Sequence, residues 1–556
     1  MAAIPTAETP ELLQSEKSPV LADALTADAT PPAPRSLKFW AVFFALCLLS
    51  ISTSLEATSI TIALPTIIRS INIGSEYVWV GNAFLLSYTL VQRVIGQLAD
   101  TFGGRWPLII STVLFVIGSG VSGGATNAGM LIGGRTVQGL GSGAIFVLFD
   151  VVISDLVSLQ DRDKFRGLVY VAGALGSSIG PIVGGAIAQA DWRWCFYLHV
   201  VTGGLGLVYL VLFLDLKHQP KPWKEALASI DYPGIVVFQG SVTALLLGLV
   251  FGGVVFPWNS ANTIVPLVVG GVGWIMFHVW ESTRFCRNPI VPSRLFTNRT
   301  SAAGFFLAFD GGMLLFWIIW FLPVYFQGVR GDRPLISGVH QLPFNLFFVP
   351  AYIAAGIAVA KTGKYRPYHF AGFALASIGV GLFTLLGPHT NTAAWVFFQI
   401  FAAVGLGVNM TAVLPAIQSA LEESDVAMVT SMYAFSDNFG RIFGVTIPAV
   451  VFNGQVNSLL HRISSPDARQ KLANGNAYGF AAMGGVHGLP EDVRNEVLGV
   501  YTDSLKTVWQ VAIAFALAGF LAAFAIRQHG MARASDTKSG LDEAKTETPP
   551  EDKVHA

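Results

Sequence analysis

Glu56, Arg135 and Asp150 are ionisable residues that stand inside stretches otherwise made of apolar side chains. A charge within a bilayer costs roughly 2.5–3.5 kcal/mol on insertion scales, so such residues usually have a partner or a function. Burial favours the protonated form of a carboxyl group and a nearby guanidinium favours the ionised form, so a small change in their separation can move a proton. We therefore expect Glu56 to bind and release a proton beside Arg135, with Asp150 as a second candidate proton carrier.

The depths of Glu56 and Arg135 are compatible with such a pair. Glu56 lies 18 residues after Lys38, about 27 Å along a helix that rises 1.5 Å per residue, and so in the far half of the stretch 38–62. Arg135 lies near the start of the stretch 129–153, which crosses in the opposite direction. The two side chains can then meet at one depth. The alternative is a static buried salt bridge that does not titrate.

Three further acids fall within or near apolar stretches, and each has a competing interpretation. Asp155 is expected to be solvated, because it stands close to the end of its stretch. Asp310 either reaches a central cavity or is hydrated near the membrane–water interface. Arg441 follows Asp437 by four residues, so these two can neutralise each other along one helix face.

A glycine face runs along the stretch 166–188, where small residues recur every three or four positions: Gly173, Gly176, Gly180 and Gly184. Such spacing lets another helix backbone approach closely. Pro181 removes one helix hydrogen bond and bends the stretch, and Gly185 extends the small surface. The face can seal a path against leakage while helices rock, or it is a generic packing surface.

A second small-residue string, Gly96-Gln-Leu-Ala-Asp100-Thr-Phe-Gly103-Gly104-Arg105, follows the stretch 77–98. Its glycines permit a tight turn. Asp100 can lie against the positive N-terminal end of a helix, an interaction worth roughly 0.3–1 kcal/mol. The expected helix is 426–452, which begins just after Glu422-Glu423-Ser-Asp425. We expect those acids to face Arg105 or Arg166; the alternative is a set of ordinary loop charges.

The elements that must position these residues are membrane-spanning helices. Charged residues make up 12% of the chain and hydrophobic residues 53%, and the 34 basic and 34 acidic residues cancel, which leaves no net field for nucleic acid. A span needs about 20 mostly apolar residues. We expect fourteen spans: 38–62, 77–98, 106–124, 129–153, 166–188, 195–216, 232–252, 263–282, 301–325, 339–360, 368–388, 393–416, 426–452 and 507–527.

Lysine and arginine in the short loops predict the orientation of the chain. The loops on one side carry fourteen such residues and the short loops on the other side carry four, namely Arg69, Arg193, Arg330 and Arg333. Both termini are therefore expected in the cytoplasm. The polar segment 453–506 is then an outer loop, in which 489–505 can form an amphipathic surface helix.

Aromatic residues crowd the stretch 301–325: Phe305, Phe306, Phe309, Phe316, Trp317, Trp320, Phe321 and Tyr325. Some can line a cavity for bulky apolar molecules. We expect more of them to face lipid or to form interfacial belts.

These motifs together resemble the major facilitator superfamily, and within it the fourteen-span drug:proton antiporter family that is common in fungi as toxin and multidrug exporters. The string 96–105 resembles the superfamily's gating motif, and Arg135-Thr-Val-Gln138-Gly139-Leu-Gly141 resembles its proton-coupling motif. Gly176-Ser-Ser-Ile-Gly180-Pro181-Ile-Val-Gly184-Gly185 resembles the antiporter signature of its exporters. The chain departs from the family at Glu56, where Asp is usual, at Gly104, usually basic, and at Asp437, where Arg is usual.

The resemblance implies an all-α integral membrane protein with the major facilitator fold, in which two extra central helices separate two six-helix bundles. The expected regions are a disordered cytoplasmic tail (1–36), an N-terminal bundle (37–217), a linker with the two extra helices (218–299), a C-terminal bundle that includes the outer loop 453–506 (300–527) and a second disordered tail (528–556).

The implied activity is proton-coupled efflux of small, largely hydrophobic organic molecules, such as toxins, secondary metabolites or drugs, by alternating access. In this interpretation Glu56, Arg135 and Asp150 couple protons, while the gate consists of Gly96, Asp100, Gly103 and Arg105. No enzymatic activity, cofactor or metal is expected, because the energy comes from the proton gradient. The expected partners are the substrate, protons and the bilayer, with no nucleic acid.

The implied protein is a monomer of the plasma membrane, with a vacuolar or vesicle membrane as the alternative. Two other functions stay open on the same fold. One is a facilitator or importer of a polar metabolite. The other is a membrane sensor that transports nothing.

Overall fold

The computed structural model describes residues 36–529 except positions 72, 74–75, 158, 217–230, 254, 284–285, 287–288, 290, 292, 422–424, 483–485 and 487. The two tails predicted to be disordered therefore lie almost wholly outside the described residues. Apart from one isolated bridge between Gly252 and Phe256, every regular element in the described part is a helix. This is the expected result for a chain in a bilayer, where each backbone polar group must be paired within its own segment.

Six helices form the N-terminal half: α2 (Leu37–Ile71), α3 (Tyr77–Phe102), α4 (Arg105–Gly123), α5 (Ala128–Leu156), α6 (Leu159–Ala190) and α7 (Trp194–Phe213). Two more helices and a short turn follow: α9 (Tyr232–Phe251), α10 (Ala261–Glu281) and η3 (Ser293–Phe296).

Six long helices and several short ones form the C-terminal half: α11 (Arg299–Val324), η4 (Tyr325–Val329), α12 (Pro334–His340), α13 (Leu342–Thr362), α14 (Arg366–Phe383), α15 (Thr392–Ala420), α16 (Val426–Leu459), η6 (Leu460–Arg462), α17 (Pro466–Leu472), α18 (Ala477–Ala482), α19 (Glu491–Ala522) and η7 (Ala523–Ala525).

Helices therefore occur at all fourteen predicted stretches. Twelve of the described helices are long and apolar enough to cross a membrane. The other two, α3 and α14, have 26 and 18 residues and include polar side chains such as Gln92 and His369. The all-α fold class is confirmed, and the count of fourteen spans stays a prediction.

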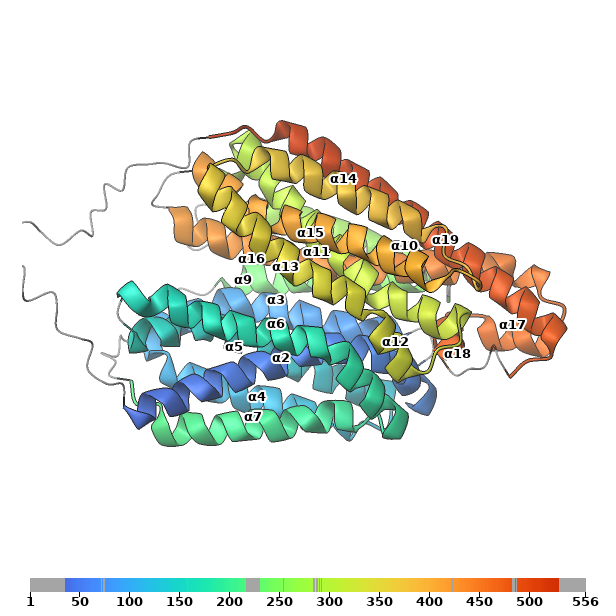
Figure 1. Ribbon diagram of the computed structural model, residues 1–556, viewed down its shortest axis with the longest axis horizontal. Coiled ribbons are helices and arrows are strands. Elements are labelled where there is room, and N and C mark those ends of the chain that lie inside the picture. The colour runs from blue at the N-terminus through green and yellow to red at the C-terminus, as the bar shows by residue number, and fades with distance from the viewer. Residues whose placement is uncertain are drawn as a thin grey trace, which may run out of the picture.

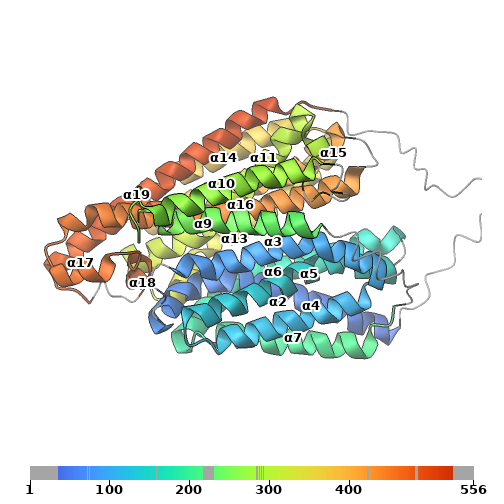
Figure 2. The ribbon, with the colours of Figure 1, turned by 180° about the vertical axis from the view of Figure 1, so that it is seen from behind.

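The halves lie side by side along the long axis of the molecule (Figure 1). On the face seen in Figure 2, the two extra helices α9 and α10 lie against each other. Helix α9 packs on α16 of one half and on α3 of the other, so it lies where the halves meet. We call the end that holds α12, α17 and α18 the cap end. The start of α2 and the end of α19 lie at the opposite end, which we call the terminal end (Figure 1).

The predicted outer loop 453–506 is shorter than expected. Helix α16 continues to Leu459 and α19 begins at Glu491, so 489–505 is mostly the first part of a spanning helix and not a separate surface helix. Between these two helices, the described short helices α17 and α18 lie at the cap end (Figure 1). Tyr478 in α18 is buried, and its ring stacks on Tyr77 with centroids 4.4 Å apart.

The expectation that most aromatic residues of the stretch 301–325 face lipid is wrong. All of Phe305, Phe316, Trp317, Trp320, Phe321 and Tyr325 are buried, whereas Phe306 is exposed. The reason is the place of α11 in the fold, because this helix packs on α15, α16 and α19, and also contacts α2 and α18. Trp317 packs on Phe515 of α19 and Phe321 on Phe452 of α16, within the C-terminal half, whereas Trp320 lies against Gly81 of the N-terminal half.

Candidate functional site

Glu56 and Arg135 are in direct contact. Glu56 comes from α2 and Arg135 from α5, and an Nη1 group of the arginine donates to Oε1 of the carboxylate. Each residue is only 1% exposed. The structure thus brings together the two residues that the sequence analysis matched by depth. The second carboxylate oxygen of Glu56, Oε2, is buried without a hydrogen-bond partner among the described residues.

Neighbouring helices hold the Arg135 guanidinium in place. Its Nε donates to the Val80 carbonyl at 3.0 Å, and Nη1 also donates to Gln138 Oε1 at 2.7 Å. Its carbon Cζ lies 4.2 Å from the centroid of the Phe84 ring. Helix α3 therefore fixes the cation from one side and α5 from the other, so the position of α2 decides how closely Glu56 approaches.

A buried histidine lies near this pair and was missed by sequence analysis. His199 in α7 is 1% exposed, and its Nδ1 is 3.0 Å from the Ser52 hydroxyl, one turn before Glu56 on α2. Its Nε2 has no partner among the described residues. The available signal was a lone histidine inside the apolar stretch 195–216.

Asp150 lies apart from the Glu56–Arg135 pair. Its side chain is 41% exposed and forms a salt bridge with Arg166 Nε at 2.9 Å. The Tyr170 hydroxyl donates to the same carboxylate at 3.1 Å. Asp150 follows Arg135 by fifteen residues, or about 22 Å along α5. Asp150 therefore belongs to a half-exposed ion pair near the terminal end and not to the buried Glu56–Arg135 pair.

The predicted gate is described only in part. Gly96 and Asp100 fall in α3, but the surroundings of Gly96 and the side chain of Asp100 lie outside what the structure describes. Gly103 ends α3 with φ of 75°, a backbone conformation that favours glycine, and its N–H donates to the Ala99 carbonyl at 2.9 Å. Arg105 pairs with Asp215 at 3.2 Å.

The expectation that the acids before α16 face Arg105 or Arg166 is wrong for Asp425, the described member of that group. Asp425 pairs with Arg294 of η3 at 3.0 Å. Arg105 and Arg166 instead pair with Asp215 and Asp150, both from the N-terminal half. At the terminal end, Arg105 and Arg166 thus pair within the N-terminal half. The cation beside Asp425 at the start of α16 is Arg294 of η3.

The glycine face of α6 packs directly on α2. A methyl group on Gly176 would stand 2.5 Å from the Ile51 carbonyl oxygen, and one on Gly184 would stand 2.5 Å from that of Ser59. A methyl on Gly180 would overlap Thr58 Oγ1. Because the obstacles at Gly176 and Gly184 are backbone atoms, the two helices cannot take up larger side chains without separating.

The last part of the same string contacts the other half. A methyl group on Gly185 would stand 2.5 Å from the Pro334 carbonyl oxygen of α12, and Gly338 of α12 lies directly against the Pro181 carbonyl. Nearby, Gln327 Nε2 donates to the Ile62 carbonyl at 3.3 Å. These contacts, together with the α18 stack, join the halves at the cap end.

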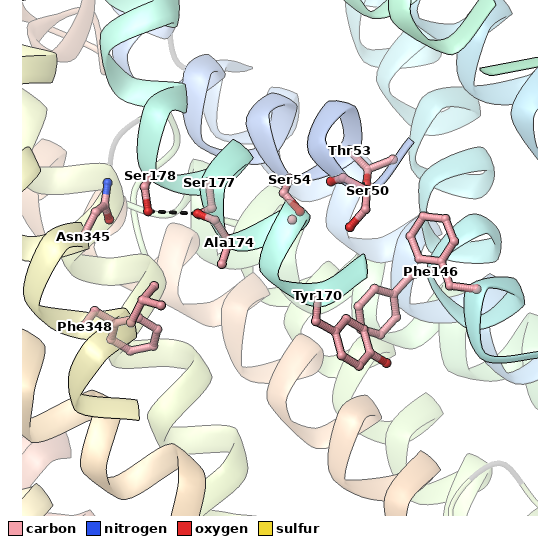
Figure 3. Close-up of a pocket in the computed structure, with 13 residues that line it drawn as sticks. Ser50, Thr53, Ser54, Phe146, Tyr170, Ala174, Ser177, Ser178, Asn345 and Phe348 are labelled. Carbon is pink, nitrogen blue, oxygen red and sulfur yellow. Dashed lines mark hydrogen bonds between the residues drawn. The ribbon is translucent and has the colours of Figure 1, made fainter. Parts of the chain in front are cut away.

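A cavity of about 270 Å³ lies between the halves, on the terminal side of Glu56. Figure 3 shows its lining side chains converging from α2, α5 and α6 on one side and from α13 on the other. The polar groups are hydroxyls and one amide: Ser50, Thr53, Ser54, Ser177, Ser178, Tyr170 and Asn345. The apolar groups include three phenylalanines: Phe146, Phe149 and Phe348.

Residues 42–445 match the sequence profile of the Major Facilitator Superfamily. The chain is 46% identical to the MFS efflux transporter aclA of Aspergillus oryzae, over 91% of this chain and 92% of that protein. It is 40% identical to the efflux pump FUS6 of Gibberella fujikuroi, over 95% and 96% of the two chains. It is also 40% identical to the MFS-type transporter gkaD of Penicillium citrinum, over 93% and 89%.

Solved structures show the same fold. One is a bacterial homologue of the human lysosomal transporter Spinster in an inward-facing and occupied conformation, with a TM-score of 0.61 at 14% identity over 88% of this chain and 97% of that one. A peptide transporter in complex with sulfate has a TM-score of 0.55 at 16% identity, over 86% and 98%. The protein is therefore a multi-pass membrane transporter, and not an enzyme, that belongs to the major facilitator superfamily.

Proposed function

We propose that the protein exports small, largely hydrophobic organic molecules in exchange for protons by alternating access. The names of its fungal relatives support the direction of transport. The buried Glu56–Arg135 pair supports coupling to protons. Fourteen membrane spans, a monomeric state, cytoplasmic termini and a plasma-membrane location belong to the same proposal.

The observation that carries the proposal is a fully buried carboxyl group with one cation and one unpartnered oxygen. Helices α3 and α5 hold the Arg135 guanidinium in place, whereas Glu56 is a residue of α2. A shift of α2 lengthens the ion pair, and a carboxylate that loses its cation in a low-dielectric site takes up a proton. The return shift releases that proton, so movement of α2 and protonation of Glu56 are linked.

The cavity supports a hydrophobic substrate with a few hydrogen-bonding groups. Phenylalanine faces supply apolar contact, and hydroxyls orient the ligand. Asn345 Nδ2 is buried without a partner among the described residues and is available to donate to an acceptor on the substrate. Thr53 and Ser54 line the same cavity two to three residues before Glu56, so a substrate there presses on the helix that carries the proton site.

The contacts at the cap end support a conformation closed on that side. Pro181 and Gly185 of α6 meet α12, and Tyr77 meets Tyr478. For the substrate to leave at the cap end, these contacts must separate. Alternating access then consists of opening this seal while the terminal end closes.

Reconstituted liposomes provide the test. With an acidic lumen, a neutral fluorescent dye should accumulate inside as protons leave in exchange for it. The dye must lack a titratable amine, because a weak base would be trapped passively in the acidic lumen. A protonophore should abolish the accumulation, and ATP without a gradient should have no effect. Dye that only equilibrates, at a rate indifferent to the gradient, would instead identify a facilitator. Accumulation driven by ATP alone would also refute proton exchange.

A further inference from the structure

Asp310 is a second buried acid, and it lacks the compensation that Glu56 has. It lies on α11, the first helix of the C-terminal half, about 17 Å along the helix from Arg299. It is 0% exposed, and both of its carboxyl oxygens are without a hydrogen-bond partner among the described residues. Proton coupling through Glu56 makes no use of it.

The surroundings of Asp310 are apolar and tightly packed. A methyl group on Gly519 of α19 would overlap both Asp310 Oδ2 and the Phe373 ring of α14. The carboxyl group therefore lies where α11, α14 and α19 meet. The cavity between the halves is lined by α2, α5, α6 and α13, so Asp310 is not one of its lining residues.

The cations on the packed helices lie at their ends or are already paired. From residue 300 to 329, Asp310 is the sole charged residue of the sequence, and α19 has no charge between Lys506 and Arg527. In α14 the titratable groups are Arg366, Tyr368 and His369, all in its first turn, and α15 has none between Thr392 and Ala420. On α16, Asp437 lies against Gly312, two residues after Asp310 on α11, and Arg441 pairs with Asp437 at 2.6 Å.

A polar pair lies beside the next residue of α11. Asn409 Nδ2 would be 3.4 Å from a methyl group on Gly311, and it has no partner among the described residues. The side-chain oxygen Oδ1 of Asn409 is 3.1 Å from Nδ1 of His369, which lies near the start of α14 at the terminal end. Polar side chains thus lead from the region of Asp310 toward that end.

An ionised carboxylate with no cation and no donor is far more costly to bury than a neutral acid, and such a group takes up a proton. We propose that Asp310 is a second proton-binding site, uncharged in this conformation and separate from the substrate cavity. It exchanges its proton when α19 moves relative to α11 and admits water along the His369–Asn409 side.

Infrared spectroscopy of the full-length protein in nanodiscs tests the site without any transport. At neutral pH the wild type should show the carbonyl band of a protonated carboxylic acid. Asp310→Asn should remove this band while the temperature of thermal unfolding stays unchanged. Glu56→Gln is the matched control and should keep the Asp310 band. The same band in Asp310→Asn as in the wild type would show that Asp310 is ionised and would overturn the proposal.

Exchange is tested on the same sample. In D₂O the Asp310 band should shift to lower frequency once a transported dye is added. A band that never shifts would identify a structural neutral acid and overturn proton binding. In the liposome assay, Asp310→Asn should lower the number of protons released per dye by about half, and an unchanged ratio would also refute the site. The dye-induced shift and the proton ratio rest on the proposed function, whereas the band at neutral pH and its loss in Asp310→Asn do not.

Discussion

The Arg135 guanidinium contacts α2, α3 and α5 at once, through Glu56, the Val80 carbonyl and Gln138. A pair of this kind stabilises only as a whole, because each charge is buried and neither can reach water. Removing one partner leaves an uncompensated charge in a low-dielectric site, whereas replacing both by glutamine leaves two neutral polar groups.

Arg135→Gln should therefore lower the free energy of unfolding by about 3–5 kcal/mol, the usual cost of breaking a buried pair. The double variant Glu56→Gln, Arg135→Gln should recover much of that loss. Thermal unfolding of the purified protein measures both. Arg462→Gln is the control, since its pair with Asp503 is about half exposed and should contribute at most about 1 kcal/mol. Additive effects of the two buried substitutions would show that the pair does not act as a unit.

At the residue scale, sequence analysis succeeded where a strong physical constraint applied. An arginine within an apolar span needs an acid at its own depth, and Glu56 met that requirement. It failed for Asp425, because surface charges pair with whichever partner the loops bring nearest, and Arg294 could not be placed from spacing alone. His199 was missed because a single histidine in an apolar stretch carries no partner information.

Helix α6 is tied to α2 by backbone-to-backbone contact along its glycine face, so substitutions there act on the packing of whole helices. Gly184→Ala should separate α6 from α2 and cost about 1–3 kcal/mol, because the added methyl group meets the Ser59 carbonyl at 2.5 Å. Gly167→Ala, in the same helix, has nothing within 4 Å and should be neutral or slightly stabilising. Equal thermal stability of the two variants would contradict this packing.

Helix α11 shows what a single span cannot reveal about itself. Its run of aromatic residues is typical both of a lipid-facing helix and of a core helix, because both surroundings are apolar. Which applies depends on how many neighbours surround the helix, and α15, α16 and α19 surround this one. The short helices at the cap end were missed for a similar reason, since the burial of Tyr478 depends on its partner Tyr77 from the other half.

At the scale of the whole molecule, the fold was predictable because twelve of the described helices are long and apolar enough to span, and a bilayer admits few alternatives. The relative position of the halves was not, since it depends on contacts between residues far apart in the chain, such as Asn82 Nδ2 with Thr446 Oγ1 at 2.7 Å. Under the proposed alternating access, contacts of this kind must change between conformations.

The cap-end seal gives a prediction about the balance between conformations. Gly185→Leu should push α12 away from α6, since the Pro334 carbonyl leaves no room for a side chain. The variant should therefore favour the conformation open at the cap end, and a cysteine in place of Ser337, which is buried in α12, should become more reactive to a water-soluble thiol reagent. Gly204→Leu on α7 is the control, because nothing lies within 4 Å of that position. Unchanged reactivity of the cysteine in Gly185→Leu would contradict the seal.

Glu56 is proposed to exchange the proton that drives export, and simultaneous recording of lumenal pH and dye in liposomes measures that exchange. The wild type should release protons in proportion to the dye taken up. Glu56→Gln should lose uphill uptake and the associated proton release while still exchanging dye across the membrane, and Glu56→Asp should restore uphill uptake. A Glu56→Gln variant that pumps uphill at the wild-type rate, with the wild-type number of protons per dye, would show that Glu56 does not carry the driving proton.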